Sequence, residues 1–292
     1  MKYKIEERDK SIILKDIEDF NPQHIFECGQ AFRWKKEKDM SYTTIAFERV
    51  LNVKKEGEDI VLSPCTRDDF QNIWNHYFDL DRDYSEIKKI LAEDPILKEA
   101  TEFGDGIRIL NQDPFEMIIS FIISANNQIP RIKKSINCLA ENYGEKIEGT
   151  AYYSFPAPVQ LAGAEAEDLR EICKVGFRDK RIVETSKIIA EGELDMESVF
   201  HMNRDEGKEL LMTLPGVGPK VSDCILLFAF NKDEAFPVDV WVKRVMEHFY
   251  LKEDTNVKKI GYHGARLFGD LAGFAQQYLF YYARELGIGR KK

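Results

Sequence analysis

The chain has 292 residues, of which 43% are hydrophobic and 32% are charged, a composition typical of an ordinary globular protein. No apolar run approaches the roughly 18 residues of a membrane-spanning helix, and the first ten residues are too charged and acidic for a signal or transit peptide. We therefore expect an intracellular, cytoplasmic protein without a membrane partner. The formal net charge of −9 excludes nucleic-acid binding through a broadly positive surface, so such binding would need local groups such as helix N-termini, backbone amides and a few arginines.

The cysteines are five in number and scattered, and none stands in a CxxC pair. This pattern predicts free thiols and indicates neither a disulfide framework nor a zinc or iron–sulfur site. We therefore expect no metal centre in this protein. The residues are Cys28, Cys65, Cys138, Cys173 and Cys224.

The first part of the chain has the pattern of a small β-sheet. Short apolar runs separated by polar or glycine-bearing turns predict strands near 11–14, 31–34, 42–46 and 60–62. From Asp68 onward the apolar spacing becomes helical. The sequence thus predicts an α+β fold. We expect an N-terminal antiparallel sheet domain with flanking helices over residues 1–95, followed by a mainly α-helical region over 96–292.

One helix start is marked by three residues in succession. Asp113 is a candidate N-cap, and Pro114 suits the first helical position because its φ is already fixed. Glu116 stands at the third position, from which a side chain can reach back to the cap. We expect a largely buried helix from this point, because the following residues 117–123 are apolar.

A glycine-rich turn with the sequence LPGVGPK occupies residues 214–220, between helical patterns over 204–212 and 221–230. Gly216 and Gly218 permit positive φ and close approach of another molecule, so the turn can aim backbone amides at a phosphate at the start of the second helix. This is the design of a helix-hairpin-helix element, here at about 204–230. The same residues would also serve as simple punctuation between two packed helices.

Three side chains near this turn are candidates for chemistry. Lys220 opens the second helix, where the positive end of the helix dipole favours a neutral, nucleophilic amine, and Cys224 shares its face four residues later. Asp239, in the sequence PVDV, stands before the next helical pattern. A solvated surface lysine and an ordinary helix cap are the alternative interpretations of Lys220 and Asp239.

The segments LPGVGPKVSDC and PVDV resemble the helix-hairpin-helix glycosylase superfamily, and within it the 8-oxoguanine DNA glycosylases. Four further segments are similar to motifs of that family and follow its order along the chain. They are GQAFRW at 29–34, SANNQIPRI at 124–132, GFR at 176–178 and the stretch from AGFAQ to Phe280 at 272–280.

The resemblance implies roles in catalysis and base recognition. Lys220 would attack the deoxyribose C1′ and form a Schiff base that also supports strand cleavage, while Asp239 would stabilise the positive charge on the sugar. The carbonyl of Gly29 would accept the N7 proton that oxidised guanine has and guanine lacks. Two further roles are implied in the base pocket. Phe280 and Cys224 would sandwich the flipped base, and Gln276 would bind its Watson–Crick edge.

The resemblance also implies contacts to the duplex. Asn126 would fill the space that the flipped base leaves, and Arg131 and Arg178 would bind the orphaned cytosine. Two departures from many eukaryotic relatives are Trp241 in place of histidine and Phe177 in place of tyrosine. They alter a phosphate contact and the wedge beside the estranged base, which leaves the preference for the opposite base open.

The sequence therefore predicts a bifunctional DNA glycosylase and abasic-site lyase that acts as a monomer on double-stranded DNA containing oxidised guanine. We expect no required cofactor and no iron–sulfur cluster, since no cysteine follows Cys224. The hairpin is a candidate site for a structural cation. The alternatives are a noncatalytic helix-hairpin-helix DNA-binding protein and a glycosylase for another damaged base.

Overall fold

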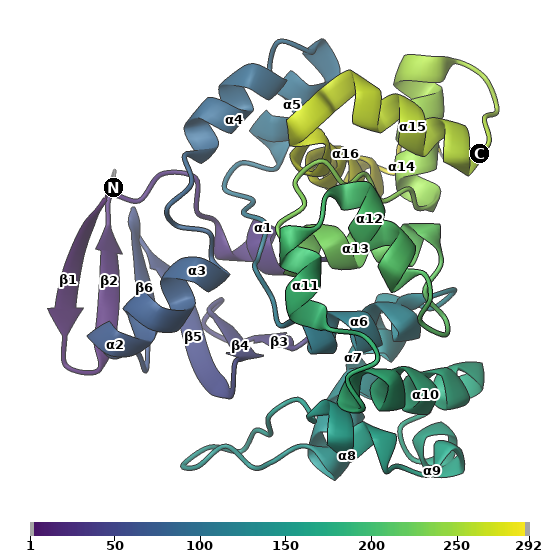
Figure 1. Cartoon of the computed structure of the whole chain (residues 1–292). Helices are drawn as coiled ribbons and strands as arrows, with labels where there is room; N and C mark the ends of the chain where they lie inside the picture. Colours follow the sequence, from purple (N-terminus) through teal and green to yellow (C-terminus); the bar gives the residue numbers. More distant parts are fainter. Residues whose placement is uncertain (1–2, 290–292) are drawn as a thin grey trace.

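The computed structural model describes residues 3–289 (Figure 1). In this part of the chain, six strands form one antiparallel sheet in the order β1-β2-β6-β5-β4-β3, and the helical region follows it. The predicted α+β fold is confirmed. The strands are β1 (Lys4–Arg8), β2 (Ser11–Lys15), β3 (Trp34–Lys36), β4 (Tyr42–Ala46), β5 (Arg49–Glu56) and β6 (Asp59–Ser63).

The predicted strands near 11–14, 42–46 and 60–62 are confirmed, but β1 and β5 were missed. The edge strand β1 is mostly charged and exposed, so it carries almost no apolar alternation. In β5, only Leu51 and Val53 are fully buried, and the second half of the strand is polar and partly exposed. The prediction of a strand over 31–34 is wrong except at Trp34, because the preceding residues leave the sheet to pack against the helical region.

Helices cover the sheet and build the rest of the molecule (Figure 1). Those that come before α6 in the chain are α1 (Pro22–Glu27), α2 (Arg67–Asp69), the π-helix η1 (Phe70–Trp74), α3 (Asn75–Tyr77), α4 (Tyr84–Leu91) and α5 (Pro95–Phe103). The buried hydrophobic residues of α4 and α5 belong to the core of the helical region. Those that follow are α6 (Pro114–Ser124), α7 (Ile129–Tyr143), α8 (Pro158–Ala162), α9 (Ala166–Glu171), η2 (Gly176–Arg178), α10 (Asp179–Ala190), α11 (Met196–His201), α12 (Arg204–Leu211), α13 (Pro219–Ala229), α14 (Val240–Val245), η3 (Met246–Leu251), α15 (Val257–Phe268), η4 (Gly269–Leu271) and α16 (Ala272–Leu286).

Two hydrophobic cores lie next to each other and share the connecting segments. The sheet core includes Leu110, from beyond the sheet, whereas Cys28, Phe32 and Tyr84 pack into the core of the helical region. The division of the chain into domains at residue 95 stays a prediction.

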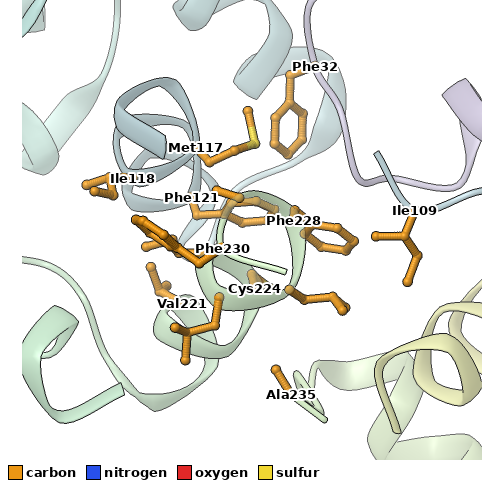
Figure 2. Packing of buried hydrophobic residues seen from close by; sticks show 14 of the residues in the cluster. Phe32, Ile109, Met117, Ile118, Phe121, Val221, Cys224, Phe228, Phe230 and Ala235 are labelled. Atoms are coloured by element: carbon orange, nitrogen blue, oxygen red, sulfur yellow. The ribbon is translucent and has the colours of Figure 1, made fainter. Parts of the chain in front are cut away.

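The helical core is centred on α6 and α13, which pack against each other. Most of the residues of both helices are buried, and the rings of Phe121 and Phe228 stack with centroids 5.7 Å apart. Figure 2 shows these rings with Phe230 and Cys224 inside the packed interior. Because α13 is buried from Val221 to Ala229, the rest of its first turn is attached to a fixed helix.

The predicted start of α6 is confirmed in its cap but not in its third position. The Asp113 carboxylate accepts a hydrogen bond from the Glu116 amide at 2.8 Å. The sequence suggested that the Glu116 side chain reaches back to the cap, but it does not. It is buried 3.6 Å from the Arg33 guanidinium, which needs an anion because it too is buried.

Gln30 joins the two parts of the molecule through its fully buried side chain. The amide nitrogen donates to the carbonyls of Ile25 at 2.9 Å and Arg108 at 2.7 Å, and the amide oxygen accepts from the Leu110 amide at 2.8 Å. One side chain thus satisfies three backbone groups from two separate segments. This explains why the segment that follows Gln30 is irregular and still well held.

None of the helices in residues 3–289 is long and apolar enough to cross a membrane. The five cysteines are free thiols, as the sequence predicts.

We expect Gln30→Leu to lower the free energy of unfolding by roughly 2 to 5 kcal/mol. The change leaves the Arg108 carbonyl and the Leu110 amide without their side-chain partner, and it leaves the Ile25 carbonyl with only the weak Cys28 thiol donor. The exposed Gln23 offers a matched control, and Gln23→Leu should change stability by less than about 0.5 kcal/mol. Urea denaturation of the two variants and the parent measures the difference. Equal stabilities of the two variants would show that the Gln30 hydrogen bonds are not needed.

Candidate active site

The glycine-rich turn joins α12 to α13 as the sequence predicts, but its two glycines differ. Gly216 has a φ of +91°, and a Cβ there would lie 2.9 Å from Cδ of Arg181. Gly218 has a φ of −99°, so it does not use the positive φ that glycine permits. The reason is Pro219, which restricts the residue before it to extended backbone. A Cβ on Gly218 would meet nothing within 4 Å, so this face of the turn is open.

Lys220 is the second residue of α13 and points toward the interior side of the turn. Its Nζ lies 5.4 Å from the centroid of the Phe121 ring, and Cys224 follows one turn later on the same helix. Burial raises the pKa of Cys224 to about 11, although Lys220 acts in the opposite direction. The thiol is therefore protonated at neutral pH and does not compete with the amine as a nucleophile.

Asp239 is the N-cap of α14. Its carboxylate accepts hydrogen bonds from the amides of Trp241 at 2.9 Å and Val242 at 2.8 Å. Burial raises the pKa of Asp239, while these two amides and the charge of Lys220 oppose that effect. The cap and the proximity to Lys220 are both present, so the two interpretations of Asp239 are compatible.

The helix α16 contributes a buried polar side chain and an aromatic ring one turn apart. Gln276 is only 5% exposed, and its Oε1 is buried without a hydrogen-bond partner among the described residues. Phe280 follows four residues later and lies against Gly29, where a Cβ would be 3.1 Å from Cε1 of the ring. Gly29 has a φ of +86°, which any other residue adopts only with strain.

These groups surround one cavity of about 840 Å³. Seven of the predicted site residues line it, from segments at both ends of the chain. They are Gly29, Asn126, Lys220, Cys224, Asp239, Gln276 and Phe280. The four others predicted to contact DNA do not line the cavity; they are Arg131, Arg178, Gly216 and Gly218.

The loop between α6 and α7 is held by Arg178. Asn126 is exposed and has a φ of +52°. The Arg178 guanidinium is buried and donates to the carbonyls of Ala125 and Asn126 as well as that of Val175. In this structure Arg178 thus supports the loop that carries Asn126, whereas Arg131 is exposed at the start of α7. Their contacts with an orphaned cytosine stay predictions.

Phe177 projects from the short helix η2 and is 57% exposed. Its ring centroid lies 4.3 Å from Cζ of Arg178 and 5.4 Å from Cζ of Arg181. An exposed aromatic ring beside two cations suits contact with a nucleic-acid base.

Trp241, which the sequence resemblance links to a phosphate contact, lines the cavity. Phe121, Gln277 and Arg284 also line it and were not assigned to the site from the sequence. Phe121 has no signal that separates it from a core residue. Gln277 is next to Gln276, and Arg284 follows Phe280 by four positions, so helical spacing alone would have placed Arg284 beside the ring. Within residues 3–289, no group of three or more histidine, cysteine, aspartate or glutamate side chains could hold a metal ion.

Two family models match consecutive parts of the chain. Residues 12–118 match the N-terminal domain of 8-oxoguanine DNA glycosylase, and residues 119–268 match the HhH-GPD superfamily of base excision DNA repair proteins. The fold and the hairpin thus define a helix-hairpin-helix base excision repair protein.

Individual relatives are similar to this protein over most of the chain. It is 37% identical to a probable N-glycosylase/DNA lyase of Methanothermobacter thermautotrophicus, over 73% of this chain and 74% of the relative. The structure is similar to that of the 8-oxoguanine glycosylase/lyase of Clostridium acetobutylicum bound to DNA with cytosine opposite 8-oxoguanine, with a TM-score of 0.95, 49% identity and coverage of 99% of this chain and 100% of that one. The chain belongs to the 8-oxoguanine DNA glycosylase family.

The raised pKa of Asp239 has a consequence for stability. Because the folded state holds the proton more tightly than the unfolded state, stability falls as pH rises from the ordinary aspartate value of about 4 through the raised pKa. Asp239→Asn keeps an oxygen for the cap and removes the charge, so we expect it to be at least as stable as the parent at neutral pH. Asp239→Ala loses the cap and should be about 1 kcal/mol less stable than the Asn variant.

Urea denaturation between about pH 4 and pH 7 tests this expectation. The difference between the parent and Asp239→Asn should move in favour of the variant as pH rises. A parent that is clearly more stable than Asp239→Asn at neutral pH would show that the charged carboxylate is stabilised by its surroundings.

Proposed function

We propose that this protein is a bifunctional DNA glycosylase that removes 8-oxoguanine from double-stranded DNA and then cleaves the strand at the abasic site. The observation that carries the proposal is the cavity that brings Lys220 and Asp239 together with a buried acceptor without a partner, Gln276 Oε1. A buried acceptor of this kind costs free energy until a ligand donates to it. The site is therefore built for a molecule that brings hydrogen-bond donors.

The acceptors of the cavity suit an oxidised guanine. The Watson–Crick edge of guanine presents two donors, N1–H and the N2 amino group, and these match Gln276 Oε1. Gly29 lines the same cavity, and no described residue donates to its carbonyl. An 8-oxoguanine donates there from N7–H, whereas the N7 lone pair of guanine would face the carbonyl oxygen unfavourably. Phe280 and the Cys224 thiol supply the apolar surfaces for the ring.

The chemistry begins when the lone pair of the Lys220 amine attacks C1′ of the flipped nucleotide. The bond from C1′ to the base breaks, and the base leaves with the bonding electrons and takes up a proton. The carboxylate of Asp239 stabilises the positive charge that develops on the sugar. Opening of the sugar ring gives the Schiff base on Lys220, and loss of a proton from C2′ then expels the 3′ phosphate, which cleaves the strand.

The hairpin supplies a docking point for the DNA backbone without any need for net positive charge. The open face at Gly218 and the free amides at the start of α13 suit a phosphate. We propose the same turn as the site of a structural cation. Asn126, Arg131 and Phe177 are exposed and available to the duplex around the extruded base.

Two features favour an enzyme over a noncatalytic helix-hairpin-helix module. Such a module needs only the turn, whereas this chain also builds a cavity with a lysine and an aspartate beside it. All the groups named come from one chain, so we propose a monomer that needs no cofactor. Its substrate places it inside the cell, with the genome.

Lys220→Gln removes the nucleophile and leaves the hairpin amides in place. We expect single-turnover excision from an 8-oxoguanine duplex to fall by orders of magnitude, with binding of that duplex kept within about one order of magnitude. The exposed Lys187 on α10 lies outside the cavity, so Lys187→Gln is the matched control and should behave as the parent. Excision by Lys220→Gln at near the parent rate would remove Lys220 from the mechanism.

We expect the Gly29 carbonyl to accept a hydrogen bond from N7–H of 8-oxoguanine. We expect the parent to excise 8-oxoguanine about 5 to 150 times faster than 8-oxo-7-deazaguanine, which has carbon in place of N7, because one hydrogen bond in a desolvated pocket contributes roughly 1 to 3 kcal/mol. Gly29→Val should impair excision of 8-oxoguanine, because φ of +86° and the nearby Phe280 ring force the backbone to shift. Equal single-turnover rates of the parent on the two bases would show that N7 is not read.

A further inference from the structure

The carbonyl of Gly29 can distinguish 8-oxoguanine from guanine only if it is held in place. The backbone segment that carries it belongs to no helix or strand. Gly29 follows α1 and its C-cap Cys28, and it precedes the irregular segment that leads to β3. A displacement of the carbonyl by a fraction of an ångström would weaken the hydrogen bond to N7–H. Something outside the segment has to fix it.

Two side chains of α16 are hydrogen-bonded to the carbonyls immediately before Gly29. Gln277 Nε2 donates to the Cys28 carbonyl at 2.9 Å, across 249 residues of sequence. The Arg284 guanidinium donates to the Glu27 carbonyl. Gln277 and Arg284 are seven positions apart, two turns of the helix, so they lie on one face of α16 and reach two consecutive carbonyls. Figure 1 shows α16 near α1.

Both donors are shielded from water. Gln277 is 2% exposed, and the Arg284 side chain is 16% exposed. Hydrogen bonds from such donors are not exchanged freely with solvent, and a guanidinium gives a strong charge-assisted bond. The same guanidinium lies 5.2 Å from the centroid of the Phe280 ring, so Arg284 also supports the aromatic surface of the pocket.

We propose that Gln277 and Arg284 are positioning residues that clamp the Glu27–Cys28 backbone and thereby aim the Gly29 carbonyl at N7 of the damaged base. The inference rests on the proposed function. The helix α16 then has two tasks: Gln276 and Phe280 contact the base, and Gln277 and Arg284 hold the carbonyl that identifies it as oxidised. Selectivity for the lesion is therefore set in part by residues that need not touch N7.

The test measures single-turnover excision of 8-oxoguanine and of 8-oxo-7-deazaguanine by Gln277→Leu and by Arg284→Met, and takes the ratio of the two rates for each enzyme. We expect the ratio to fall at least about fivefold from its parent value in each variant, because the carbonyl is no longer aimed. A loss of stability or of active protein does not change this ratio, since both rates come from the same preparation. Tyr282→Phe removes a hydrogen bond from α16 to Glu99, away from the clamp, and should keep the parent ratio.

A ratio within about twofold of the parent in both variants overturns the clamp while leaving the proposed function in place. Equal excision rates of the parent on the two bases would show that the Gly29 carbonyl does not recognise N7–H. The clamp would then be overturned as well. A parent that does not excise 8-oxoguanine at all overturns the proposed function itself.

Discussion

The geometry of the site depends on one short connection, residues 27–33, which leaves α1, enters the helical region and returns to the sheet. Gln30 fixes its middle by satisfying three buried backbone groups. Phe32 packs onto Phe121 of α6 with ring centroids 5.7 Å apart, and Arg33 lies against the buried Glu116. The side chains of this segment thus contact both parts of the molecule, and its backbone reaches the sheet at Arg33, whose carbonyl accepts a hydrogen bond from the Ile45 amide at 3.0 Å. Gly29 in this segment lines the cavity together with residues of α16.

The site also shows how an acidic protein can act on DNA. The net charge is −9, yet the groups around the cavity include the cations Lys220 and Arg284 beside the carboxylate of Asp239. Both cations oppose the effect of burial on the pKa of Asp239, which favours the ionised form that catalysis needs. Helix N-termini add partial positive charge at the same places, since Lys220 opens α13 and Asp239 caps α14. Local arrangement replaces a broadly positive surface.

Features set by spacing within one element could be predicted from the sequence. They include the turn before Lys220, the caps at Asp113 and Asp239, and the placement of Gln276 and Phe280 on one helix. Features set by distant partners could not. The clamp from Gln277 and Arg284 depends on carbonyls about 250 residues away, which no local pattern encodes. Glu116 was assigned to its cap because the buried Arg33 opposite it has no signature in the sequence. The extended backbone at Gly218 follows from Pro219, because a proline restricts the residue before it. From the sequence we considered only the positive φ that glycine permits.

In the proposed mechanism Lys220 becomes covalently bound to the sugar of the nucleotide whose base is excised. The most direct measurement is borohydride reduction of the reacting complex with an 8-oxoguanine duplex, followed by nuclease and protease digestion and mass spectrometry of the peptide that carries the adduct. We expect a stable amine adduct on the peptide that contains Lys220, at that residue. An adduct on another lysine, or base release with no adduct at all, would contradict it.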